Sequence, residues 1–153
     1  MKIEYRQISR PYSFSSPFAD AEFAILIYIS DMTITAEERE LLCDQIVAAG
    51  CRYAVCAGYQ CEIWHDSVDF AYLKLNNWES EDETLIMTTW HEKESLEDIV
   101  FFFLNNTTFD NFTAANMLVV LFGDAKEILE NIQTEINKQL TYVNFRIIVP
   151  RKA

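Results

Sequence analysis

The feature that most constrains the fold is a regular alternation along the chain between short apolar runs and segments with helical spacing. Residues 23–29 form a continuous, Ile-rich run, which is typical of a strand covered on both faces in a parallel sheet. Further apolar runs predict strands at 52–57, 84–89, 116–122 and 145–149. Because helical segments separate these runs, the pattern predicts an α/β fold, a three-layer sandwich with a mainly parallel, Rossmann-like sheet of about five strands.

The helical segments carry start signals of their own. Thr35 and Ser95 are each followed three residues later by an acid, the spacing of a capping box, and each predicts a helix start. Apolar residues recur at helical spacing through 125–140 and predict the last helix. A further helix is expected at 61–76. Its inward side chains are expected to be Ile63, Val68, Tyr72 and Leu75.

The length of 153 residues predicts one α/β domain covering residues 1–153. Residues 1–22 hold two prolines and several aromatic residues, so we expect an extended N-terminal arm that packs on the body and is a candidate edge strand. The chain shows neither a signal-peptide pattern nor an apolar run long enough for a bilayer. Its four cysteines fall within 43–61 and are interpreted as reduced thiols. We therefore expect a cytoplasmic protein with no membrane contact.

The net charge of −12 is concentrated in one part of the chain. Residues 60–98 contain 11 acidic and 2 basic residues. Nucleic-acid binding depends on Lys and Arg neutralising phosphates, so this distribution argues against a nucleic-acid partner. A basic protein is the natural electrostatic complement.

The two histidines stand in similar triplets, Trp64-His65-Asp66 and Trp90-His91-Glu92. In an open α/β sheet, ligands bind beyond the carboxyl ends of the strands. One hypothesis is therefore a small enzyme with acid–base groups at that rim, using His65, His91, Asp31 and Asp66. The alternative is that each imidazole is a structural hydrogen-bonding group beside a packed tryptophan.

Metal and cofactor sites find little support in the sequence. Cys56, Cys61, His65 and His91 are residue types that bind zinc, but their spacing is not that of a standard zinc site. No glycine-rich dinucleotide motif follows the first apolar run, and no Walker-type loop is present. We expect neither a metal nor a cofactor.

A binding surface is the other interpretation of the acidic segment. Aromatic residues set among acids resemble a protein-binding hot spot with an electrostatic rim. The expected partner-binding residues are Trp78, Glu79, Glu81, Asp82, Glu83, Trp90, Glu92 and Glu94. A third option is a self-associating module that uses the apolar run Phe101, Phe102 and Phe103.

Three short stretches carry a resemblance to known proteins: Gly50-Cys51-Arg52-Tyr53-Ala54, residues 61–69 and residues 87–92. Together they resemble an uncharacterised family of small bacterial α/β proteins. The resemblance covers roughly residues 23–105 and implies no activity. In size and acidity the chain is also similar to immunity proteins of bacterial toxin systems, which implies an inhibitor that neutralises a basic toxin domain.

Overall fold

The computed structural model describes residues 1–148, with side chains through residue 142. It contains five strands and four helices. The strands are β1 (Lys2–Ile8), β2 (Phe23–Ile29), β3 (Cys51–Gly58), β4 (Met87–Trp90) and β5 (Asn116–Phe122). The helices are α1 (Ala36–Ala48), α2 (Cys61–Leu75), α3 (Leu96–Asn105) and α4 (Lys126–Ile148).

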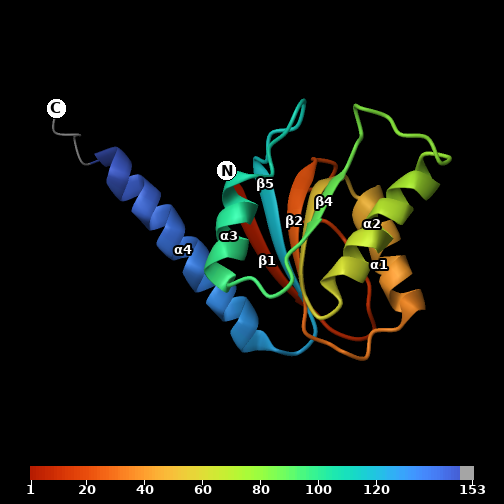
Figure 1. The fold of residues 1–153 in the computed structure, drawn as a ribbon, viewed down its shortest axis with the longest axis horizontal. Coiled ribbons are helices and arrows are strands. Elements are labelled where there is room, and N and C mark those ends of the chain that lie inside the picture. Colours follow the sequence, from red (N-terminus) through yellow and green to blue (C-terminus); the bar gives the residue numbers. More distant parts are fainter. Residues whose placement is uncertain (149–153) are drawn as a thin grey trace.

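The strands form one sheet in the order β1-β5-β2-β3-β4, and every neighbouring pair is parallel. Helices α1 and α2 cover one face of the sheet, and α3 and α4 cover the other (Figure 1). The predicted α/β fold with a parallel sheet between two helical layers is therefore confirmed. No helix in the described part of the chain combines the length and the apolarity needed to cross a bilayer.

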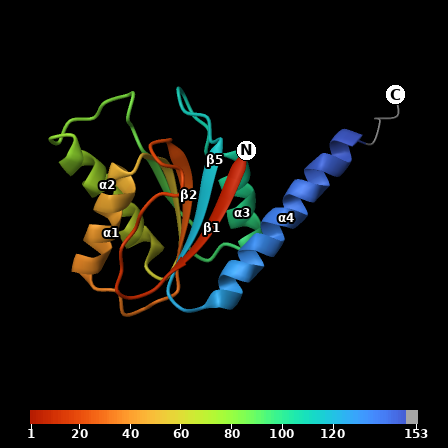
Figure 2. The ribbon, with the colours of Figure 1, turned by 180° about the vertical axis from the view of Figure 1, so that it is seen from behind.

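The N-terminal arm supplies the edge strand β1, which pairs with β5. Its alternation of polar and apolar residues, Lys-Ile-Glu-Tyr-Arg-Gln-Ile, suits a half-exposed edge strand. The rest of the arm runs over the same face as α1 (Figure 2). There it buries Tyr12, Phe14 and Phe18 against the sheet.

The predicted strand at 145–149 is wrong. Residues 145–148 continue α4 as a helix, and residue 149 lies outside the described residues. A short apolar run does not by itself distinguish a strand from a helical segment. Here β1 already occupies the position next to β5, and the helical periodicity of α4 continues without a breaker until Pro150.

The helix starts follow the expected chemistry. Thr35 Oγ1 accepts a hydrogen bond from the Glu38 amide at 3.1 Å, and the Glu38 carboxylate accepts one from the Thr35 amide at 3.0 Å. Ser95 Oγ accepts from the Asp98 amide at 3.1 Å. These bonds satisfy amides that have no partner within the helix.

In α2 the expected inward face is only half correct. Val68 and Tyr72 are buried, but Ile63 is 40% exposed and Leu75 is 59% exposed. The buried stripe also contains smaller residues and a tryptophan: Cys61, Trp64 and Ala71. Because these residues already cover the sheet, Ile63 and Leu75 remain on the outer side of the helix.

Candidate functional site

The C-terminal ends of the strands, where the sequence suggested a ligand site, are closed by backbone hydrogen bonds. At the ends of β2 and β5, the amides of Ser30 and Asp31 both donate to the Phe122 carbonyl, at 2.9 and 3.1 Å. The Tyr59 amide donates to the Ile29 carbonyl at 2.9 Å. These three amides at the strand ends are therefore not free to hold a phosphate.

Asp31 is held in a network of its own. Its carboxylate accepts hydrogen bonds from the Tyr12 hydroxyl at 2.7 Å, the Thr33 hydroxyl at 2.6 Å and the Thr33 amide at 2.8 Å. The bonds from Thr33 and Tyr12 lower the pKa of Asp31. Asp31 thus anchors the N-terminal arm to the end of β2.

An ion pair extends this network. Arg10 binds Glu38 through two nitrogens, each at 2.9 Å, and its guanidinium lies 3.9 Å from Asp31. The hydrogen bonds from Arg10 lower the pKa of Glu38 to about 2. We call Arg10, Tyr12, Asp31, Thr33 and Glu38 the rim network. Each of its polar groups has a partner within the network.

His65 lies on α2 and packs against Trp90, with ring centroids 4.6 Å apart. Its Nδ1 is 2.9 Å from the Asp66 carboxylate, and its Nε2 is 3.6 Å from that of Asp69. Asp69 also accepts a hydrogen bond from the Thr88 hydroxyl at 2.7 Å, which connects α2 to β4. This imidazole therefore lies between carboxylates and an indole ring at the sheet edge.

His91 lies in a different environment. Its Nε2 is 2.9 Å from the Thr89 hydroxyl, its Nδ1 pairs with Glu94, and its ring packs on Phe102 with centroids 4.6 Å apart. Side chains alternate along a strand, so Trp90 faces α2 and His65, whereas His91 faces α3. The two imidazoles lie on opposite faces of the sheet and share no carboxylate partner among these contacts.

The enzyme hypothesis needed His65, His91, Asp31 and Asp66 at one rim. The structure brings together His65 and Asp66 only. Asp31 belongs to the rim network, and His91 is buried on the other face. The positions of these residues do not favour a shared acid–base centre.

All four cysteines are buried free thiols. Burial raises the pKa of each of them, to about 12 for Cys43 and well above the ordinary value for Cys56. In the described part of the chain, no three His, Cys, Asp or Glu side chains come together as a ligand set for a metal. The zinc alternative therefore finds no support, and we interpret the thiols as core groups.

The expected partner-binding residues lie along one edge of the molecule. Four of them, Glu79, Glu81, Asp82 and Glu83, belong to the loop that leads from α2 into β4 and are called the loop acids. Glu92 and Glu94 follow β4 at its other end and are called the rim acids. All six are exposed. The loop acids and the rim acids lie at opposite ends of β4, so only the rim acids lie at the end of the sheet where His91 follows β4 (Figure 1).

The three tryptophans have different environments. Trp64 is 2% exposed and stacks on Phe122 with centroids 5.3 Å apart, so it belongs to the core. Trp78 and Trp90 are 58% and 44% exposed. Both pack on α2, Trp78 through Phe70 and Trp90 through His65. We call the loop acids, the rim acids and these two exposed tryptophans the β4-edge surface.

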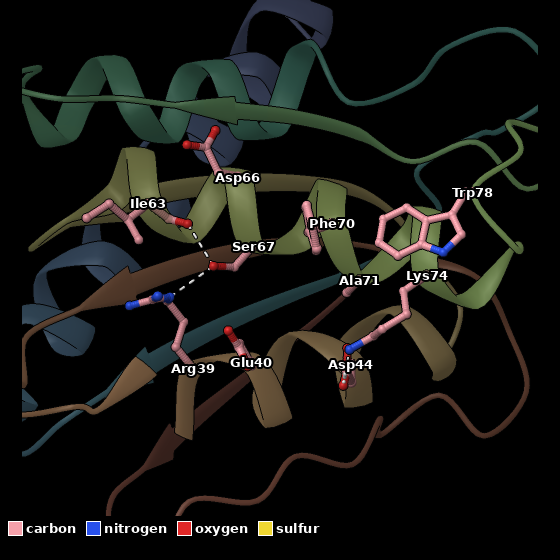
Figure 3. A pocket seen from close by; sticks show the side chains of 10 residues that line it. All are labelled: Arg39, Glu40, Asp44, Ile63, Asp66, Ser67, Phe70, Ala71, Lys74 and Trp78. Atoms are coloured by element: carbon pink, nitrogen blue, oxygen red, sulfur yellow. Dashed lines mark hydrogen bonds and ion pairs between the residues drawn. The ribbon is translucent and has the colours of Figure 1, made fainter. Parts of the chain in front are cut away.

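Sequence reasoning missed a shallow hollow of about 430 Å³ between the outer sides of α1 and α2. Arg39 donates to Ser67 at 2.9 Å, and Lys74 pairs with Asp44 at 2.9 Å, so each bond crosses from one helix to the other (Figure 3). Phe70 and Trp78 line the same hollow (Figure 3). No sequence signal marked this hollow, because Ile63, which lines it, was expected to face inward.

A family model described as "Domain of unknown function (DUF7684)" matches residues 3–139. The chain belongs to this family. Comparison with curated proteins and with solved structures found no match.

The DUF7684 match begins in β1 and ends within α4, so it includes all five strands. It extends beyond the resemblance seen in the sequence, which covered only residues 23–105. The agreement is at the level of an uncharacterised family, and the family description assigns no activity. Any role for this DUF7684 chain has to be argued from its surfaces.

Proposed function

We propose that this chain is a protein-binding domain whose partner is a basic protein, and that it acts as an immunity or antitoxin-like inhibitor of a basic toxin domain. The β4-edge surface is the proposed contact region. Its carboxylates would provide the electrostatic attraction, and Trp78 and Trp90 the apolar contacts. The proposed role needs neither a metal nor a cofactor.

The observation that carries this proposal is the set of carboxylates without a cationic partner. Within the described residues, neither the loop acids nor the rim acids form an ion pair with Lys or Arg, and only Glu94 pairs, with His91. Elsewhere several cations pair with acids, as Arg10 does with Glu38 and Lys74 does with Asp44. The negative charge along the β4 edge therefore remains available to a cationic partner.

The dimensions of the surface suit one partner. A stable interface covers about 800 Å² on each protein, a patch roughly 30 Å across. The four residues of β4 span only about 13 Å. A single partner of ordinary size can therefore contact acids at both ends of β4, with α2 supporting both tryptophans between them.

The test is a comparison of two charge-reversed variants. Glu81→Lys/Asp82→Lys/Glu83→Lys changes three of the four loop acids, and Asp20→Lys/Glu127→Lys/Glu130→Lys changes three exposed acids elsewhere. Immobilised wild type and both variants are exposed to the same cell lysate at low and at high salt. Any basic protein retained is then purified, assayed for toxin activity and titrated against each form.

The proposal predicts that one basic protein binds wild type and the control variant, and that its activity is inhibited on binding. The loop-acid variant should bind at least tenfold more weakly, and high salt should reduce the affinity of wild type. Equal binding by both variants, or affinity insensitive to salt, contradicts the proposed surface. Retention without inhibition contradicts the inhibitor role while keeping the binding site.

A further inference from the structure

A second candidate interface lies on the opposite side of the sheet and is independent of the proposed function. A groove of about 850 Å³ runs between α3 and α4 and is lined in part by Met1, Phe101 and Leu104. Phe101 is 57% exposed and Met1 is 69% exposed, so the apolar lining is open to solvent. In the run Phe101, Phe102 and Phe103, only Phe101 is exposed. Phe102 is half-buried and Phe103 is fully buried.

The rim of this groove is acidic. Glu97 and Asp98 line it from α3, and Glu135 lines it from α4, against one lysine, Lys138. Gln139 donates to the Glu97 carbonyl at 3.0 Å and so joins the two helices along the groove. An apolar floor with an acidic rim fits an occupant that is apolar and basic.

The end of α4 has this composition. Helix α4 is 23 residues long, about 34 Å, and its C-terminal part extends away from the rest of the domain (Figures 1 and 2). In sequence, residues 143–148 read Val-Asn-Phe-Arg-Ile-Ile, and Arg151 and Lys152 follow. The first half of α4 is acidic, with Glu127, Glu130 and Glu135 against one lysine.

We propose that the α3–α4 groove of one copy binds the end of α4, residues 141–148, from a second copy. The ten residues of α3 span about 15 Å, and eight helical residues span about 12 Å, so the lengths match. Because each copy has both a groove and a projecting end, a two-fold arrangement makes the contact twice. The end of each α4, which has Arg146 in its sequence, then lies at the acidic groove of its partner.

The test measures the mass of the full chain in solution by light scattering after gel filtration, over a concentration series. We expect about 36 kDa, twice the monomer mass of 17.8 kDa. Phe101→Glu should weaken the dimer by at least tenfold, since it puts a charge on the apolar floor. Phe70→Glu is the matched control, because Phe70 is 61% exposed on the α1–α2 side, and it should leave the mass unchanged.

A mixing experiment separates this arrangement from other dimers. Arg146→Glu alters the projecting end but not the groove, and should also weaken self-association. A mixture of Phe101→Glu and Arg146→Glu copies has one intact groove and one intact end per pair. The mixture should therefore form a heterodimer at concentrations where each variant alone is monomeric.

Three results contradict the proposal. They are a monomeric wild type at all concentrations, a dimer broken by Phe70→Glu but not by Phe101→Glu, and a mixture that associates no better than its components. If the wild type is monomeric at all concentrations, the occupant of the groove is instead a basic helix from another protein. Circular dichroism of each variant identifies any loss of association that follows from unfolding.

Discussion

The rim network and the β4-edge surface contain similar residue types, and they differ in how those residues are satisfied. At the rim, Asp31 and Glu38 bind Thr33, Tyr12 and Arg10 at hydrogen-bond distance. At the β4 edge, the loop acids face solvent. Interactions within the chain account for Asp31 and Glu38, but no interaction with Lys or Arg in the described residues accounts for the loop acids. A carboxylate is therefore informative about function where the fold does not use it.

Substitutions of the tryptophans are expected to produce the largest changes in the free energy of unfolding. Trp64→Ala removes a buried ring that stacks on Phe122 and should lower the free energy of unfolding by about 3–5 kcal/mol. Trp78→Ala and Trp90→Ala should each lower it by less than about 1 kcal/mol, since both rings are partly in solvent. Urea unfolding followed by far-UV circular dichroism measures all three. If Trp78→Ala destabilises as much as Trp64→Ala, Trp78 is a core residue and not a binding residue.

Substitutions of two glycines are expected to produce intermediate changes in the free energy of unfolding. Gly58 lies at the rim with φ +85°, and an added Cβ would meet the backbone of Ile29. Gly50 lies at the other end of the sheet with φ +108°, where the nearest atom to an added Cβ is 3.6 Å away. Gly58→Ala should cost about 3 kcal/mol and Gly50→Ala about 1 kcal/mol, because only the first adds a backbone clash to the positive-φ strain. Equal costs in urea unfolding would show that the rim backbone can adjust.

The smallest effect is a dependence of stability on pH. The folded-state pKa values of Asp31 and Glu38 are lowered, so their stabilisation is complete above the unfolded pKa, near 4, and is lost as pH falls through the folded values. Asp31→Asn should cost about 1 kcal/mol at pH 7 and flatten the loss of stability between about pH 5 and pH 2. Urea midpoints at several pH values measure this slope.

Asp82→Asn is the control, since the structure assigns that side chain no hydrogen bond or ion pair in the described residues. Its pH slope should match that of wild type. An equal flattening by both substitutions would mean that general charge repulsion, and not the rim network, produces the acid sensitivity.

Most of the fold could be predicted because its signals are local. Residues 23–29 and 116–122 were expected as strands and match β2 and β5, since a run buried on both faces has no polar positions. Thr35 and Ser95 marked helix starts through bonds to amides three residues away. The strand expected at 145–149 was wrong because helix and strand are both compatible with a short apolar run, and the choice depends on which sheet position is free.

The candidate site was less predictable. His65 and His91 occupy similar triplets, yet they lie on opposite faces of the sheet. His65 projects from α2, whereas His91 directly follows the edge strand β4 and continues the alternation of its side chains. The triplet pattern contains no information on which face each residue takes. The α1–α2 hollow also depends on how the two helices pack against each other. The sequence of either helix alone does not reveal that packing.

The sequence by itself determined the acidic charge, the order of most elements and the burial of the central strands, because these depend on composition and on neighbours along the chain. Only the tertiary structure decided which acids have partners, which tryptophans reach solvent and where α4 extends beyond the domain. These properties depend on contacts between residues far apart in the chain, such as Tyr12 with Asp31 and Arg52 with Asn111. Distance in space, and not position in sequence, sets the energy of such contacts.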